Sequence, residues 1–111
     1  MREIELRTVT QLAASTTAEY VMCPAISDQR TLHVTSVRAE DISNTVTYFD
    51  LVIKRAGLVF VLDRYYPATA SKIYTFKGDW FVPENCQIGV MFYGATAADV
   101  VTICVNGVYE S

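Results

Sequence analysis

The sequence has few of the residues from which catalytic and metal sites are built. It contains one histidine, His33, and three cysteines, and no two cysteines form a CxxC pair. A zinc or other transition-metal site needs several such ligands, so the composition argues against a metal. General base catalysis by His33 would need an orienting carboxylate, and none lies near it in the sequence. We therefore expect a structural or simply exposed histidine.

Motifs for phosphate, nucleophile and calcium chemistry are also missing. The five glycines form neither GxGxxG nor GxxxxGK[ST], no serine stands in GxSxG, and no DxDxDG-like loop occurs. A carboxylate pair for glycoside hydrolysis could be formed by acids that meet in space, and the candidates are Asp50, Asp63, Asp79 and Glu84. These four acids lie at expected strand ends and turns, where acids are normally solvated. The sequence predicts no catalytic residue, no cofactor and no small-molecule substrate, and thus a protein that is not an enzyme.

Charge and hydropathy argue against several partners. The net charge is −3 and the basic residues form no cluster, so no nucleic-acid partner is expected. No apolar run approaches the ~20 residues of a membrane helix, and Met1–Glu5 does not resemble a signal peptide. We expect a protein made in the cytoplasm, not secreted and without a membrane partner. Cys23, Cys86 and Cys104 then suit reduced, buried thiols, with one disulfide plus a free thiol as the alternative.

Short apolar stretches rich in β-branched and aromatic residues make up most of the chain, a composition typical of strands. The expected strands are 3–9, 20–26 with Pro24 at an edge or bulge, 32–39, 46–55, 58–66, 72–76, 80–82, 86–93 and 100–105 with a continuation to 109. Ala56-Gly57 is expected to form a hairpin turn, and Lys77-Gly78-Asp79 a turn before Trp80. Residues 11–17 are small and polar, which suits a loop or one helical turn.

This pattern predicts an all-β fold, an antiparallel β-sandwich that is jelly-roll-like with about eight strands and no significant helix. A seven-stranded immunoglobulin-like sandwich is the alternative, although Trp80 lies just before Cys86 instead of midway between two cysteines. Residues 1–111 are expected to form a single domain, with residues 1–17 as a candidate extended N-terminal arm that reaches a neighbouring subunit.

Aromatic residues are concentrated on either side of one expected loop. Adjacent residues of a strand point to opposite faces, so one of Tyr65 and Tyr66, and one of Trp80 and Phe81, should point outward or into a neighbouring subunit. Because 51% of the chain is hydrophobic, some apolar surface should meet a partner, most simply a second copy. The candidate interface residues are Tyr65, Tyr66, Tyr74, Trp80 and Phe81. An ordinary core with exposed tyrosines and a sugar-stacking platform are the competing interpretations.

The carboxy-terminal part of the chain carries a family resemblance. The strand with Tyr74 and Phe76 is followed by the segment 81–88 with its Pro-Glu-Asn turn, the Ala/Thr-rich turn 94–98 and the valine-rich closing segment 101–110. This order of strands and turns resembles that of the small β-sandwich virion proteins of tailed bacteriophages. It covers roughly residues 72 to 110; Glu84-Asn85 stands where those proteins more often have Gly-Asp, and the leading half has no specific match.

The resemblance implies a structural subunit of the virion, of the capsid decoration (cement) type. Such a subunit would be a homotrimer that binds its neighbours and a major capsid or other virion protein through apolar and aromatic contacts, and so stabilises the shell. A tail or neck component is equally compatible with the sequence. A carbohydrate- or receptor-binding module is the alternative from another class, and it predicts an exposed Trp80 or Tyr66.

Overall fold

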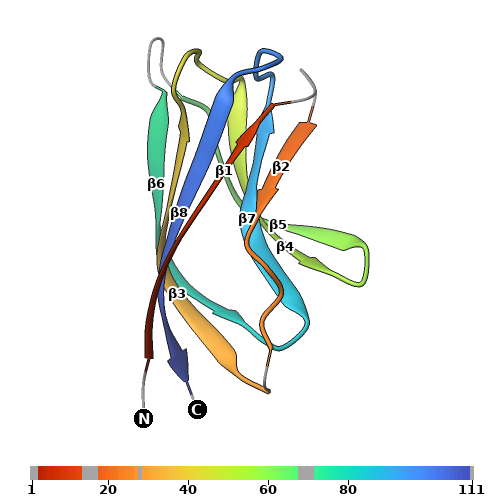
Figure 1. Ribbon diagram of the computed structural model, residues 1–111, viewed down its shortest axis with the longest axis vertical. Helices are drawn as coiled ribbons and strands as arrows, with labels where there is room; N and C mark the ends of the chain where they lie inside the picture. Colours follow the sequence, from red (N-terminus) through yellow and green to blue (C-terminus); the bar gives the residue numbers. More distant parts are fainter. Residues whose placement is uncertain (1–2, 14–17, 28, 68–71, 111) are drawn as a thin grey trace.

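The computed structural model describes residues 3–13, 18–27, 29–67 and 72–110 (Figure 1). Within these ranges the chain forms eight strands and no helix, so no described helix is long and apolar enough to cross a membrane. The strands form two four-stranded sheets in which every neighbouring pair is antiparallel. The predicted antiparallel β-sandwich is confirmed.

The order of the strands within the sheets is that of a jelly roll. One sheet contains, in order, β1 (Glu3–Leu12), β8 (Val100–Glu110), β3 (Thr31–Asp41) and β6 (Ile73–Val82), and the other contains β2 (Ala18–Met22), β7 (Cys86–Tyr93), β4 (Tyr48–Arg55) and β5 (Leu58–Tyr65). The first strand pairs with the last, the second with the seventh, and so on inward to the β4–β5 hairpin. This nested pairing gives two Greek keys, which excludes the seven-stranded immunoglobulin-like alternative.

The core lies between the two sheets and is built by alternation along the strands. On β8, Val101, Ile103 and Val105 are fully buried, while the residues between them are only half-buried. Phe49 and Phe92, from neighbouring strands of the other sheet, meet edge to face with ring centroids 5.3 Å apart. Each such buried side chain stabilises the fold by about 1.5–3 kcal/mol relative to its exposed state.

The cysteines are present as thiols, as expected. Cys23 and Cys86 are buried among core residues, and Cys104 is half-buried on β8.

Two local predictions differ from the structure. Lys77-Gly78-Asp79 is not a turn: β6 runs without interruption from Ile73 to Val82, and only its register against β3 shifts there. The Trp80 ring lies over Gly78, where an added Cβ would come within 2.9 Å of it. The strand expected over 20–26 ends at Met22, before Pro24, which lacks the N–H that a ladder needs.

The segment considered as an N-terminal arm is largely part of the sandwich. Its residues 3–12 form β1 and pair with β8 of the same chain at all ten positions, from Glu3 opposite Tyr109 to Leu12 opposite Val100. The helical turn considered for residues 11–17 is not seen in its described part, because Gln11 and Leu12 belong to β1. Residues 14–17 lie outside the described residues.

Candidate interaction surface

The β4–β5 hairpin projects from the side of the sandwich (Figure 1). Its turn consists of Ala56 with φ of 51° and Gly57 with φ of 82°. Positive φ at both central residues defines a type I′ turn, whose twist matches that of the two strands, and the predicted hairpin turn is therefore confirmed. The register of the two strands shifts between Leu51 and Val52, and this irregularity lies between the base of the hairpin and its tip.

The strand β5 carries an uninterrupted apolar run that is exposed. Leu58, Val59, Phe60, Val61 and Leu62 are exposed to 62%, 38%, 53%, 54% and 38%, respectively. We call these five residues the β5 apolar edge. β5 is the last strand of its sheet, so one side of it presents backbone N–H and C=O groups without a neighbouring strand.

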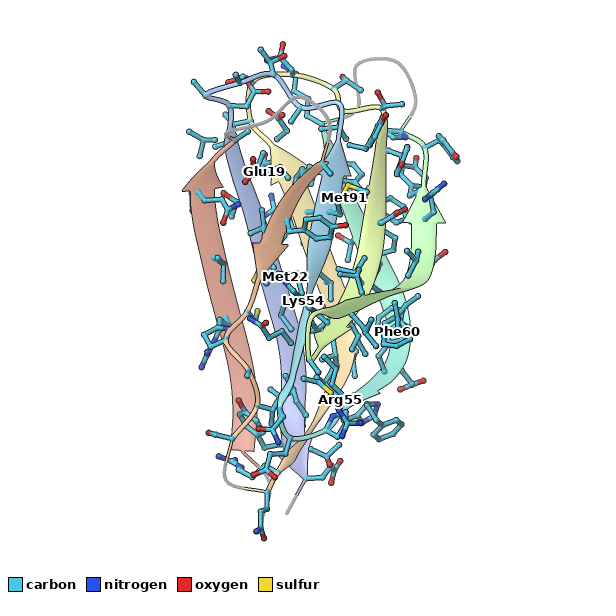
Figure 2. All side chains as sticks on the ribbon, turned by 90° about the vertical axis from the view of Figure 1, so that its right-hand side faces the viewer. Glu19, Met22, Lys54, Arg55, Phe60 and Met91 are labelled. Atoms are coloured by element: carbon cyan, nitrogen blue, oxygen red, sulfur yellow. The ribbon has the colours of Figure 1, made fainter. Side chains whose placement is uncertain are left out.

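Both faces of the hairpin are apolar. Val61 lies opposite Val52, and Phe60 lies opposite Ile53. Residues opposite one another share a face and successive residues alternate, so Phe60 and Val61 point to different faces. Figure 2 views the molecule from the side on which the hairpin projects, with Phe60, Lys54 and Arg55 on that side. A strand with this pattern is ordinarily covered on both faces.

An ion pair fixes the base of the hairpin. The carboxylate of Asp50, on β4, is only 1% exposed and accepts hydrogen bonds from Nε and Nη2 of Arg64, on β5, at 2.6 and 2.9 Å. These bonds raise the pKa of Arg64 above its ordinary value, which keeps the guanidinium charged. Asp50 and Arg64 are directly opposite in the ladder, so the pair holds the register of the strand beside the β5 apolar edge.

A tyrosine cluster surrounds this ion pair. The Arg64 guanidinium lies 4.1 Å from the centroid of the Tyr48 ring, and Tyr48 stacks on Tyr93 at 4.7 Å. Tyr66 approaches Tyr48 at 5.4 Å and accepts a hydrogen bond of 3.4 Å from Arg64 Nη1. Tyr66 is 62% exposed and Tyr93 is 37% exposed. The cluster therefore presents aromatic and cationic groups together on the surface.

The five candidate interface residues divide between the core and the surface. Tyr65 and Tyr74 stack at 3.7 Å between β5 and β6, and together with Trp80 they pack against the core. Tyr66 and Phe81 are exposed. The alternation rule for the two adjacent pairs is thus confirmed, since one member of each packs inward. A role of these residues in an interface stays a prediction.

Sequence reasoning missed the β5 apolar edge. It assigned the segment to a strand but did not consider what would cover it. The signal was present: five consecutive apolar residues without alternation predict a strand that needs contacts on both faces.

The structure brings His33 to two carboxylates that are far away in the sequence. Its Nε2 is 2.7 Å from Oδ1 of Asp79, its Nδ1 is 3.9 Å from Oε1 of Glu110, and its ring stacks on Phe81 at 4.5 Å. Among the residues with described positions there is no group of three metal-ligating side chains and no pocket. The half-buried histidine is held by these contacts, and a structural role for it stays a prediction.

The four acids considered as candidates for a catalytic pair each contact a different group. Asp50 binds the Arg64 side chain, Asp63 the Arg64 backbone N–H, Asp79 the His33 ring and Glu84 the Gln29 backbone N–H.

The carboxyl pair that does form, Asp41 with Asp99, lies elsewhere. Asp41 Oδ1 accepts hydrogen bonds from the backbone N–H groups of Ser43 and Asn44, whereas Asp41 Oδ2 is buried without such a donor. Asp99 accepts from the Asn44 amide at 2.7 Å and from the Thr96 N–H at 3.1 Å. Burial, and then the hydrogen bond with Asp99, raises the pKa of Asp41 to about 6, while that bond lowers the pKa of Asp99. The Asp41 carboxyl therefore holds its proton to a higher pH than a free aspartate does, while Asp99 ionises more readily.

Comparison with known proteins adds no relative. A scan against protein-family models gives no match, and a search of curated proteins finds no similar sequence. The fold and the surface define the chain as a jelly-roll sandwich with an exposed apolar edge strand.

Proposed function

We propose that the chain is a non-enzymatic structural subunit of a phage particle, a capsid decoration (cement) protein that stabilises the shell through apolar and aromatic contacts. The observation that carries the proposal is the β5 apolar edge, which is exposed on both faces of its hairpin and along its free side.

Such an edge favours assembly for two physical reasons. Removing apolar surface from water is favourable by roughly 25 cal/mol per Å². An added strand would also satisfy the backbone groups along the free side, as in β-strand addition. Soluble proteins normally avoid long apolar edges because such edges aggregate. An edge of this kind, on a hairpin fixed by an ion pair between the buried Asp50 and the exposed Arg64, is therefore suited to a specific protein partner.

The phage setting is supported by the resemblance of residues 72–110, which span β6, β7 and β8. A cement subunit needs one surface for its neighbours and another for the shell. The β5 apolar edge suits the first contact, and the exposed Phe81, on the other sheet, suits the second. A homotrimer and a major capsid protein as partner belong to this proposal, and so does a location in the virion.

The test is to look for the chain in purified particles. Gradient-purified virions of the phage that encodes it should contain the chain at a copy number comparable to that of the major capsid protein, measured by quantitative mass spectrometry. Particles made without it should lose their DNA at a lower temperature and regain resistance when the purified chain is added. Its absence from virions would contradict the proposal.

The tyrosine cluster favours a second candidate function, a carbohydrate- or receptor-binding module. Tyr66 is exposed, as that function predicts, and Arg64 lies beside its hydroxyl. A glycan array distinguishes the two functions. Saturable binding to one glycan that is lost in Tyr66→Ala would favour the module, whereas no binding at millimolar glycan would leave the structural role.

A further inference from the structure

The β5 apolar edge has a palindromic sequence. Leu58-Val59-Phe60-Val61-Leu62 reads the same in both directions, with Phe60 at its centre. An antiparallel pair of identical strands has a two-fold axis, and the contacts across that axis are reciprocal. If the axis passes between two copies of Phe60, Val59 lies opposite Val61 and Leu58 lies opposite Leu62 of the second copy. Every residue of the edge then meets one of its own type.

We propose that the β5 apolar edge binds a second copy of this chain, with the two β5 strands antiparallel about a two-fold axis at Phe60. The pairing joins two four-stranded sheets, β2-β7-β4-β5 from each copy, into one continuous sheet. It gives the free N–H and C=O groups of β5 partners, and it places β-branched and aromatic side chains opposite one another, pairs that stabilise antiparallel ladders.

The charges at the two ends of the edge select the antiparallel direction. The hairpin tip carries Lys54 and Arg55, which lie opposite Val59 and Leu58, and the far end of the edge carries the exposed Asp63. With the axis at Phe60, Asp63 lies opposite Gly57 of the second copy, at the tip that holds the cations. A parallel pairing would instead place like charges beside each other, which is unfavourable.

The same features favour a second copy over an unrelated strand. An unrelated apolar strand could satisfy the backbone groups of β5. Only a second copy necessarily matches both the palindromic sequence of the β5 apolar edge and the opposite charges at the ends of that edge. Self-complementarity of this kind is the defining property of an isologous interface. The inference rests on the proposed function and deepens it by naming one of its partners. It requires an even number of copies, which for the homotrimer of that function means two trimers joined through their β5 apolar edges.

Single-cysteine cross-linking tests the axis directly. Phe60→Cys, Leu58→Cys and Leu62→Cys are made in a Cys104→Ser background, in which Cys23 and Cys86 are buried. Directly opposite residues have Cα atoms about 4.5–5.5 Å apart, within the range of a disulfide. Two copies of position 58 would instead be about 13 Å apart along the strands, out of reach.

The proposal predicts which of these variants form covalent dimers. On mild oxidation Phe60→Cys should form a disulfide-linked dimer, Leu58→Cys alone and Leu62→Cys alone should not, and their equimolar mixture should. Circular dichroism checks that each variant is folded. Failure of Phe60→Cys to cross-link, or equally efficient cross-linking of Leu58→Cys alone, would overturn the two-fold axis. If the wild-type protein is monomeric at a concentration of about 50 μM, the self-pairing itself is overturned. Neither result would remove the chain from purified virions, so the proposed function is tested separately.

Discussion

At the scale of single residues, the most informative groups are buried acids, each of them less than 7% exposed. Asp41, Asp50 and Asp99 are the buried charged residues in the described part of the chain. Burial of an ionised carboxylate is costly unless the charge is removed or compensated. Asp50 is compensated by Arg64, whereas burial raises the pKa of Asp41 and so favours its neutral form. These two solutions respond differently to pH and to mutation.

The raised pKa of Asp41 predicts a pH dependence of stability. Because the pKa of Asp41 is raised from 3.8 to about 6, the native state retains a proton that the unfolded chain releases. This contribution to the free energy of unfolding is fully present below pH 3.8 and is lost as the pH rises through 6. In Asp41→Asn the amide can donate to Asp99 at every pH, and its oxygen still accepts from Ser43 and Asn44.

Relative to the wild type, Asp41→Asn should therefore gain of the order of 1–2 kcal/mol of stability between pH 4 and pH 7. Urea unfolding at several pH values measures this difference. Asp63→Asn, at an exposed position, serves as the control and should follow the wild-type curve. Parallel curves for the wild type and Asp41→Asn would show that the pKa of Asp41 is not raised in the folded protein.

The Asp50–Arg64 pair predicts a large loss of stability when its cation is removed. Arg64→Ala leaves the Asp50 carboxylate buried without its partner, which is the costly way to break such a pair. Arg38→Ala is the matched control, since Arg38 pairs at 3.6 Å with Glu40 on the surface. The urea midpoint should fall clearly in Arg64→Ala and hardly change in Arg38→Ala. Equal changes in the two variants would contradict a structural role of the Asp50–Arg64 pair.

At the scale of elements, the hairpin turn is not optimal. Ala56 has a positive φ, which costs a residue with a Cβ about 1 kcal/mol or more. Asn-Gly is the preferred type I′ pair, so Ala56→Asn should raise the free energy of unfolding by about 0.5–1 kcal/mol. Asn85 also has a positive φ, so Asn85→Ala should have the opposite effect. Chemical denaturation measures both, and a destabilised Ala56→Asn would mean that the turn is of another type.

The elements also show which features the sequence can predict. Alternation and turn residues were sufficient for the β7 strand, expected and found over residues 86–93, and for the β4–β5 hairpin. Lys77-Gly78-Asp79 has the composition of a turn, but pairing with β3 holds it in a strand, and this tertiary effect is invisible locally.

The same limit applies to the candidate site. The Asp79 carboxylate that orients His33 is 46 residues away, so proximity in the sequence could not identify it. The expected surface aromatics were identified only by alternation, which says that one residue of each adjacent pair is outside but neither which residue it is nor which strand lies at an edge. The β5 apolar edge depends on that missing fact.

At the scale of the whole molecule, β5 differs from two other edge strands, β2 and β6, in how it is protected. The edge strand β2 has five residues, and β6 has the exposed Lys77 and Asp79 at its irregular register. Short length, charges and bulges are the usual means by which edge strands avoid pairing with other chains. The apolar run of β5 contains no charge. This contrast supports the proposal that β5 is the edge strand that pairs with another molecule.

The mass of the protein in solution tests this account most directly. Sedimentation equilibrium of the wild type is compared with that of Val61→Lys and Ile42→Lys. These positions are 54% and 55% exposed, but only Val61 belongs to the β5 apolar edge. The account predicts an even-numbered oligomer for the wild type and for Ile42→Lys, and half that number of copies for Val61→Lys. A wild type that is monomeric, or an oligomer that persists in Val61→Lys, would contradict it.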